Sequence, residues 1–437
     1  MSLHPFTTDP DVVVVGAGAA GIGASLALTR MNVPHVILEA KDRIGGRAYS
    51  ESHSLGYLWD HGCHWFHSAD KNPLRKIAER LGHGFVQEMS PGRYQSFIDG
   101  KRGPDTLRDS IWEKLEAIRE LGFAGDDVPA HLALDPNDPL YGLVRHWATL
   151  MYSVEPEQLS TRDASNYEIT GIDLPVRDGY GALLVRLAAG LPIALNSSVH
   201  AIVVGPKLAR VETDDGTLST KAVILTVPLR CFEREMIRIS PRLHGELSKA
   251  LQTIRMGWYE KIALSFDRRV FDPGVSALDT FTPDPRAHPC TWQLHPYGSL
   301  IAIAHIAGDF AREMAIKGEQ EMVQWSLEGL TQVFGSEIRK RVLNGVTTHW
   351  GTDPHIGGAY SAAKPGHADD RRHFLTPAHE RIFIAGEHAS LTAMTTAHGA
   401  FLSGMFQAHK AAERVGYETC HPDPLWVPAA HSKADQT

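Results

Sequence analysis

The first strongly apolar segment of the chain is a run of four valines at residues 12–15, followed by a glycine-rich turn and an alanine-rich stretch. Four consecutive β-branched residues predict a short strand that is buried on both faces. A second apolar run at 36–38 ends at Glu39. The succession of strand, tight turn, helix and second strand predicts a βαβ unit at the start of the chain.

Apolar patterning predicts related structure much farther along the chain. An alternating run and two continuous runs predict strands at 201–204, 222–227 and 381–387. The last of these enters a Gly-Glu turn, and the stretch 397–414 predicts a helix. These separated segments look like parts of one α/β nucleotide-binding domain.

The patterning between these segments is different. Residues 75–176 read mostly as helix, whereas 267–345 mix a strand at 300–304 with a helix at 319–334. We therefore predict a second domain, inserted into the first as two excursions, with a ligand cleft between the domains. The expected boundaries are 1–75, 177–266 and 346–420 for the first domain, 76–176 and 267–345 for the second, and 421–437 for a loosely ordered tail.

The turn after the first strand has the glycine spacing of a dinucleotide-binding motif. Gly16 lets the chain turn sharply, Gly18 lets a pyrophosphate approach the backbone, and Gly21 lets the helix pack close to the strand. The helix N-terminus offers unpaired N–H groups to phosphates. Glu39 can bind both ribose hydroxyls and would repel a 2′-phosphate, which favours FAD or NAD over NADP.

The loop that follows Glu39 combines paired glycines with arginines. It contains Arg43, Gly45, Gly46 and Arg47. A flexible loop with fixed cations suits phosphate, although a plain surface turn is the alternative. We predict a phosphate-binding role for this loop.

Composition narrows the class of protein and its partners. With 437 residues the chain is too long for one ordinary core, and 43% hydrophobic with 22% charged residues is typical of a globular protein. The net charge of −8, without a long basic block, argues against nucleic acid as a partner. A stretch of ~20 apolar residues, which a membrane-spanning helix needs, does not occur, so we expect no membrane partner.

The cysteines and histidines give no metal or disulfide pattern. The four cysteines are scattered without a C-x-x-C motif, which fits a reducing compartment, and residues 1–10 do not resemble a signal peptide. We therefore expect a cytoplasmic protein. His61, His64 and His67 recur every third residue, but no carboxylate or cysteine completes a recognisable ligand set, so we expect no metal.

The chain resembles the flavin-containing amine oxidase superfamily, which includes monoamine oxidases, polyamine oxidases and L-amino acid oxidases. The resemblance rests on ordered blocks that cover most of the nucleotide domain and is poor in the inserted domain. The blocks are V-V-G-A-G-A-A-G, L-E-A-K-D-R-I-G-G-R, G-C-H-W-F-H with N-P, D-G-Y-G-A-L, K-A-V-I-L-T-V-P-L, K-I-A-L-S-F, W-G-T-D-P, G-G-A-Y-S, A-G-E-H and G-A-F-L-S-G.

The resemblance implies a Rossmann-type, glutathione-reductase-like FAD-binding domain with an inserted α+β substrate domain. Glu39 would hold the adenosine ribose, Val199 would meet the adenine, and Glu387 would bind the ribityl or pyrophosphate region. Monoamine oxidases attach FAD through a cysteine where this chain has Ala359, so the FAD is expected to be noncovalent. The implied cofactor-binding residues are Gly16, Gly18, Ala19, Ala20, Gly21, Glu39, Ala40, Arg43, Gly46, Arg47, His64, Trp65, Val199, Gly386, Glu387, Thr396 and Ala397.

Four residues are implied to be catalytic. Lys261 would hold a water near flavin N5, although a lone lysine in a strand is more often on a solvated face. Tyr360 and Phe401 would flank the substrate amine, with core packing as the alternative, and Trp350 would pack near the isoalloxazine.

Three residues are implied to face the substrate. His64 would form part of the active-site wall. Asp60 and Glu168 match acids that polyamine oxidases carry and would attract distal ammonium groups, although both could be ordinary surface acids.

The expected reaction is FAD-dependent oxidation of an amine to an imine, with O2 as acceptor and H2O2 as product. A polyamine or a primary or secondary amine is the favoured substrate. The first alternative is an L-amino acid oxidase or a desaturase of the same fold; an amino acid oxidase needs an arginine for the carboxylate, for which Arg93 and Arg177 are open candidates. A non-catalytic FAD scaffold and a nicotinamide dehydrogenase are weaker alternatives, and a homodimer is left open.

Overall fold

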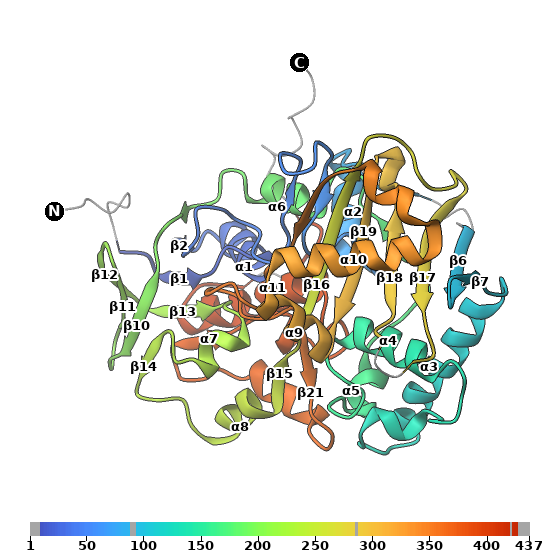
Figure 1. The fold of residues 1–437 in the computed structure, drawn as a ribbon. Helices are drawn as coiled ribbons and strands as arrows, with labels where there is room; N and C mark the ends of the chain where they lie inside the picture. The colour runs from blue at the N-terminus through green and yellow to red at the C-terminus, as the bar shows by residue number, and fades with distance from the viewer. Residues whose placement is uncertain (1–8, 88–92, 285–286, 420–421, 427–437) are drawn as a thin grey trace.

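The computed structural model describes residues 9–87, 93–284, 287–419 and 422–426 (Figure 1). A five-stranded parallel sheet brings together strands from three separated parts of the chain. Its order is β22 (Ile382–Ile384), β13 (Ala222–Leu225), β1 (Val12–Val15), β2 (His35–Leu38) and β9 (Ile193–Ala194). Because β1 is covered on both faces, all four of its valines are buried. The strands expected at 12–15 and 36–38 are thereby confirmed, and those expected at 222–227 and 381–387 are confirmed as shorter strands.

Two helices pack together against one face of this sheet. They are α1 (Ala19–Arg30) and α11 (Ala397–Arg414), and α11 begins and ends where the sequence predicts. Small residues allow the close approach: a Cβ on Gly404 would lie 1.9 Å from the carbonyl oxygen of Ala20. The opposite face of the sheet packs against a four-stranded sheet of β12 (Gly216–Thr220), β11 (Ala209–Thr213), β10 (Val199–Val204) and β14 (Arg238–Ser240).

Gly21 sits where α1 crosses the end of β1. A Cβ at this position would lie 1.9 Å from the carbonyl oxygen of Gly16. We expect Gly21→Ala to push α1 off the strand, at a cost of about 1–3 kcal/mol as for other overpacked sites. The measurement is the thermal midpoint of unfolding.

Gly329 offers a matched control for that substitution. It lies within helix α10 (Glu319–Phe334), and a Cβ there would meet only Thr280 Oγ1, at 4.0 Å. Gly329→Ala should leave stability equal or slightly raised, because alanine is the better helix former. Equal effects of the two substitutions would contradict the packing role of Gly21.

A seven-stranded mixed sheet forms the other half of the molecule, to the right in Figure 1. It pairs antiparallel except between β17 and β6, and α9 (Gly308–Lys317) and α10 pack against its core. Its strands, in order, are β20 (Val342–Thr347), β16 (Tyr259–Phe266), β19 (Ile301–Ala307), β18 (Cys290–Leu294), β17 (Val275–Phe281), β6 (Arg93–Ile98) and β7 (Lys101–Arg102).

This sheet differs from the sequence prediction at two places. The expected division at 266 assigns residues 259–266 to the nucleotide domain, yet β16 pairs with β19 and β20. The mostly helical stretch 75–176 contains α3 (Leu107–Phe123), α4 (Tyr141–Tyr152) and α5 (Thr161–Asn166), but also β6 and β7. These two strands are short and polar, so their pattern is weak. The division into two domains itself stays a prediction.

Short elements complete the chain. The remaining helices and strands are β3 (Ser50–Glu51), β4 (Trp59–Asp60), β5 (Trp65–Phe66), α2 (Pro73–Arg80), β8 (Leu174–Pro175), α6 (Tyr180–Ala188), α7 (Leu229–Glu233), α8 (Gly245–Thr253), β15 (Ile254–Met256) and β21 (Ser361–Ala363). Five 3-10 segments lie at Ala130–Ala133, Pro296–Gly298, Ser336–Arg341, Ala368–Leu375 and Glu387–Ala389. Every helix among the described residues is too short or too polar to span a bilayer.

The described part of the predicted loose tail is packed. Leu425 and Trp426 contact the core beside α1, and the carbonyl of Leu425 accepts a hydrogen bond from Arg80 Nη1 at 2.9 Å. The rest of the predicted tail, 421 and 427–437, lies outside the described residues.

Candidate active site

A cavity of about 1450 Å³ lies where the two sheets meet. Its lining runs from Glu39, at the end of β2, to Lys261 on β16 and Tyr360. A ligand pocket usually measures ~300–1,000 Å³. This cavity therefore has room for a large cofactor and a second molecule.

The glycine turn and Glu39 form one end of the cavity. A Cβ on Gly18 would touch only the Gly46 Cα, at 3.9 Å, so the backbone here is open to the cavity. The Glu39 carboxylate accepts the N–H groups of Ala17 (2.7 Å) and Lys41 (2.9 Å), which orients it. Its remaining acceptor positions suit hydroxyl donors.

Most of the cofactor-binding residues inferred from sequence line this cavity. They are Gly16, Gly18, Ala19, Ala20, Glu39, Ala40, Gly46, Arg47, His64, Trp65, Val199, Gly386, Glu387, Thr396 and Ala397. The N-termini of α1 and α11 thus both face the cavity, and each presents backbone N–H groups and the positive end of a helix dipole. The donors and acceptors fit a dinucleotide.

Arg43 needs correction, since its side chain does not line the cavity. Its guanidinium lies over the Tyr49 ring, 4.3 Å from the centroid, and Nη1 donates to the carbonyls of Ile44 (3.3 Å) and Gly46 (2.9 Å). Arg43 therefore shapes the glycine loop instead of facing a phosphate. Gly21 also lies outside the lining, where it packs against Gly16.

Glu387 anchors the middle of the cavity wall. Its carboxylate accepts from Arg47 Nη1 (3.1 Å), Ser361 Oγ (2.7 Å) and the N–H of Thr395 (3.1 Å). Burial alone would raise the pKa of Glu387, but Arg47, His388 and the Ser361 hydroxyl outweigh it and lower the pKa. Glu387 is therefore an ionised, fully paired acid.

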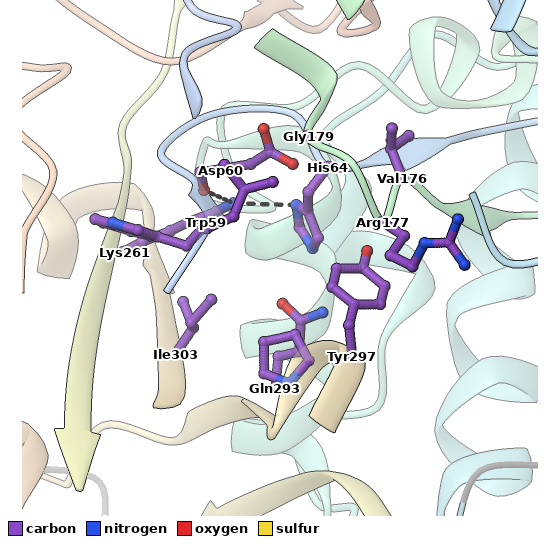
Figure 2. A pocket seen from close by; sticks show the side chains of 12 residues that line it. Trp59, Asp60, His64, Val176, Arg177, Gly179, Lys261, Gln293, Tyr297 and Ile303 are labelled. Carbon is purple, nitrogen blue, oxygen red and sulfur yellow. Dashed lines mark hydrogen bonds between the residues drawn. The ribbon is translucent and has the colours of Figure 1, made fainter. Parts of the chain in front are cut away.

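Lys261 is the buried cation of the site, only 2% exposed. Its ammonium donates to the carbonyl of Asp60 (2.8 Å) and to His64 Nδ1 (3.0 Å), as Figure 2 shows. It also donates to the carbonyl of Gly62 (2.6 Å). Burial lowers the pKa of Lys261 to about 8, against the opposing charge of Asp60. The alternative expectation, that Lys261 lies on a solvent-exposed face of its strand, is therefore wrong.

A small void adjoins Lys261. Its volume is about 20 Å³, and Asp60, His64, Gln293 and Tyr297 contribute to its walls (Figure 2). One water needs ~10–15 Å³ and two to four polar partners. The void is therefore large enough for one water beside the lysine.

A chain of rings connects Lys261 to Tyr360. His305 lies opposite Lys261 in the β16–β19 pairing and stacks on His64 with centroids 5.7 Å apart. His305 Nδ1 lies 2.7 Å from the Tyr259 hydroxyl, and the Tyr259 and Tyr360 rings are 5.9 Å apart. Sequence reasoning missed His305 and Tyr259; the one signal is a histidine within the apolar run of β19.

Of the two aromatic residues expected beside the substrate, Tyr360 and Phe401, the second needs correction. Tyr360 lines the cavity, with its hydroxyl donated to the carbonyl of Leu150. Phe401 is fully buried in the core between α1 and α11, and Gly23 faces its ring and carbonyl. Tyr259 is the ring that lies beside Tyr360.

Trp350 lines the cavity and is held by polar contacts at both ends. Its indole N–H donates to the carbonyl of His61 (3.1 Å), and its backbone N–H donates to the buried carboxylate of Glu260 (3.1 Å). Glu260 also accepts the N–H of Gly351 (2.8 Å). The indole is thus fixed in the cavity wall.

Neither acid assigned to the substrate faces the large cavity. The Asp60 carboxylate accepts from Ser50 and from the N–H of Tyr180 (2.9 Å), so it caps the start of α6. Burial raises the pKa of Asp60 to about 6. The Glu168 carboxylate is exposed and pairs with Lys71.

Asp173 lines the cavity in addition to Glu39 and Glu387, and sequence reasoning missed it. It pairs with His67 at 3.2 Å. The other two histidines of the triplet have separate partners, since His61 contacts Glu51 (3.0 Å) and His64 contacts Lys261.

Of the two arginines considered for an amino acid oxidase, Arg177 lines the small void beside Lys261 but not the large cavity. Arg177 pairs with Asp178 at 3.1 Å and is exposed, and the side chain of Arg93 lies outside the described residues. Arg108 of α3 does line the cavity, together with Trp112 and Trp147.

Comparison with known proteins gives a consistent family. The model of a family described as flavin containing amine oxidoreductase matches residues 19–136 and 139–412. Polyamine oxidase 4 of Oryza sativa subsp. japonica is 28% identical over 97% of this chain and 93% of its own length. Polyamine oxidase 2 of Arabidopsis thaliana is 26% identical over 94% and 89%. Lysine-specific histone demethylase 2 of Homo sapiens is 26% identical over 92% of this chain but 53% of its own length.

Proposed function

Because the chain belongs to the family of flavin-containing amine oxidoreductases, we propose that it uses noncovalent FAD to oxidise a primary or secondary amine and passes the electrons to O2. The observation that carries the proposal is one continuous cavity lined by Glu39, Glu387, Lys261 and Tyr360. A flavin supplies the two-electron acceptor that amine oxidation needs. The protein's own residues have to bind the flavin and the amine, orient them and exclude water from them.

The proposed FAD orientation follows from the two ends of the lining. Glu39 would take the adenosine ribose, Gly18 and the α1 N-terminus the pyrophosphate, and the α11 N-terminus at Thr396 the far end of the isoalloxazine. This places the redox-active ring near Lys261, Trp350 and Tyr360. The Rossmann-type character of the parallel sheet supports this orientation, since ligands of such sheets bind at the carboxyl ends of the strands.

Noncovalent attachment is proposed from the residues near that ring. Ala359 cannot form a thioether, and burial raises the pKa of the Cys63 thiol to about 12, which keeps it protonated and unreactive. Acid precipitation should therefore release all yellow colour into the supernatant. Flavin that stays with the precipitated protein would contradict this part of the proposal.

The chain's residues would prepare the amine in three ways. The Tyr259 and Tyr360 rings orient it, and their apolar surroundings disfavour its ammonium form. Tyr360 is fixed by Leu150, and Trp350 by Glu260 and His61, so the walls keep their positions. Lys261 and the water-sized void beside it would supply a fixed positive charge and one ordered water.

The overall chemistry balances with O2 and water. Loss of two electrons and two protons converts the amine C–N bond to an imine, which water hydrolyses to an aldehyde or ketone and a released amine or ammonia. O2 takes up the two electrons and two protons and leaves as H2O2. Relatives named polyamine oxidases make polyamines the first substrates to test, although Asp60 and Glu168 no longer support that choice.

The test is an amine panel with the purified yellow protein. Monoamines, diamines and polyamines are added without air while flavin absorbance is followed, and peroxide is measured when air returns. We expect bleaching by at least one amine and stoichiometric peroxide. The absence of bleaching with every amine would overturn the proposal, and bleaching without peroxide would overturn the choice of O2.

A further inference from the structure

One arm of the cavity, formed by α3 and α4, is cationic and aromatic. We call it the α3–α4 arm, and its residues are Arg108, Trp112, Trp147, Leu150 and Met151. Building on the proposed function, we propose that Arg108 binds an anionic group, such as a carboxylate, at the end of the substrate distant from the oxidised amine. The enzyme would then prefer amines with a distal carboxylate over diamines and polyamines.

The order of residues along the arm shows what separates Arg108 from Tyr360. Tyr360 donates its hydroxyl to Leu150, and Trp147 lies one turn earlier on α4. The Trp147 and Trp112 rings are 5.6 Å apart, and Arg108 lies one turn before Trp112 on α3. Two helical turns of ~5.4 Å each and one ring-to-ring step therefore separate Arg108 from Leu150 along the arm. An α-carboxylate, bonded to the reacting carbon, could not reach Arg108.

Arg108 is half-buried, and the contact described for it is with a ring. Its guanidinium lies over Tyr94, 4.8 Å from the centroid. Burial lowers its pKa from the usual arginine value, yet an arginine remains charged. A guanidinium that uses its face on a ring keeps its N–H edge for a planar anion.

The walls of the arm are fixed by a buried acid. Asp279 is fully buried and accepts from Trp147 Nε1 (2.7 Å), Thr291 Oγ1 (2.6 Å) and the Tyr94 hydroxyl. Asp279 therefore holds both the ring beneath Arg108 and one of the two indoles. An arm braced in this way is preorganised for a ligand.

The positive charge of Arg108 favours a substrate with a distal anion over one with a distal ammonium. A charge-assisted hydrogen bond to arginine is worth ~10–100-fold in affinity, and a distal ammonium at the same position meets a like charge. Asp173 of the cavity lining comes from the segment beside β8 and not from α3 or α4. The two tryptophans suit a chain or ring between the amine and the anion.

The experiment compares three amines of equal length: hexylamine, hexamethylenediamine and ε-aminocaproate. The second-order rate constant of flavin bleaching is measured without air for each. We expect ε-aminocaproate to exceed hexamethylenediamine by about tenfold or more. Shortening the acid to γ-aminobutyrate should reduce the advantage, because its carboxylate lies closer to the oxidised amine and farther from Arg108.

Charge variants test the residue itself. Arg108→Gln should remove most of the preference and Arg108→Glu should reverse it toward the diamine. Arg102→Gln is the matched control, since Arg102 is exposed and pairs with Asp105 at 2.9 Å. The control should keep all three rate ratios.

Failure of this inference is distinguishable from failure of the proposed function. Hexanoate binding by calorimetry needs no turnover and should weaken at least tenfold in Arg108→Gln. The assignment of the arm would be overturned if the diamine bleached the wild-type flavin fastest. It would also be overturned if hexanoate bound Arg108→Gln as tightly as the wild type. No bleaching by any amine would overturn the proposed function alone.

Discussion

Replacing Lys261 with methionine is expected to leave the protein yellow while slowing flavin turnover by about 10²-fold or more, the usual contribution of a positioned acid–base group. Methionine keeps much of the lysine's length but removes the three hydrogen bonds to Asp60, Gly62 and His64. The contacts of Lys261 include neither the glycine turn nor Glu39, so flavin affinity should change little. Stopped-flow measurement of the reductive and oxidative half-reactions separates binding from turnover.

The same variant should lose a pH dependence. Because the pKa of Lys261 is lowered to about 8, its ammonium is present below pH 8 and is lost as the pH rises through that value. Transfer of electrons to O2 builds negative charge that a nearby cation stabilises. The oxidative rate constant of the wild type should therefore fall above about pH 8, and that of Lys261→Met should be flat there.

A surface lysine provides the control for both measurements. Lys340 is exposed and pairs with Glu337 at 2.7 Å. Lys340→Met should match the wild type in both half-reactions and in the pH profile. If Lys261→Met also matched the wild type, the catalytic role proposed for Lys261 would be discarded.

The parallel sheet could be predicted from sequence because each signal is local. Four valines, a glycine turn and a closing glutamate each report on a few neighbouring residues, and α11 and α10 have their predicted ends. β6 and β16 show the limit of this approach. The first is too polar for its pattern to stand out, and the second has partners, β19 and β20, that lie 35 or more residues away in the chain.

A site residue could be predicted from sequence where one local segment carries the whole signal. It could not be predicted where the direction of the side chain decides whether the residue faces the cavity or the core. Ala400 and Phe401 are adjacent on α11, but successive residues of a helix point ~100° apart, so Ala400 lines the cavity while Phe401 enters the core. Glu168 and Asp173 lie in the irregular segment between α5 and β8, where no periodic pattern tells which side chain faces the cavity. His305 and Arg108 reach the site through strand pairing and helix packing, which no local pattern reports.

Removal of the Asp163 carboxylate is the substitution expected to destabilise the protein most. Arg371 is 1% exposed and donates to Asp163 through Nε (2.6 Å) and Nη2 (2.8 Å), so Asp163→Ala leaves a buried guanidinium without its counter-ion. Breaking a buried pair by removing one partner costs ~3–5 kcal/mol. We expect a loss of that size in the free energy of unfolding from urea titration of the flavin-loaded protein.

Flavin retention should fall with stability, because the pair also positions the cofactor site. Arg371 Nη1 donates to Ser361 Oγ (2.9 Å), and Ser361 in turn donates to Glu387 (2.7 Å) in the cavity wall. The neighbouring exposed pair of Arg162 and Asp369 is the control, since Arg162→Ala should cost ~1 kcal/mol or less. Because the penalty comes from the unpaired charge, adding Arg371→Met to Asp163→Ala should restore part of the lost stability. If the two substitutions instead lowered the free energy of unfolding additively, lost packing and not the unpaired charge would be the cause.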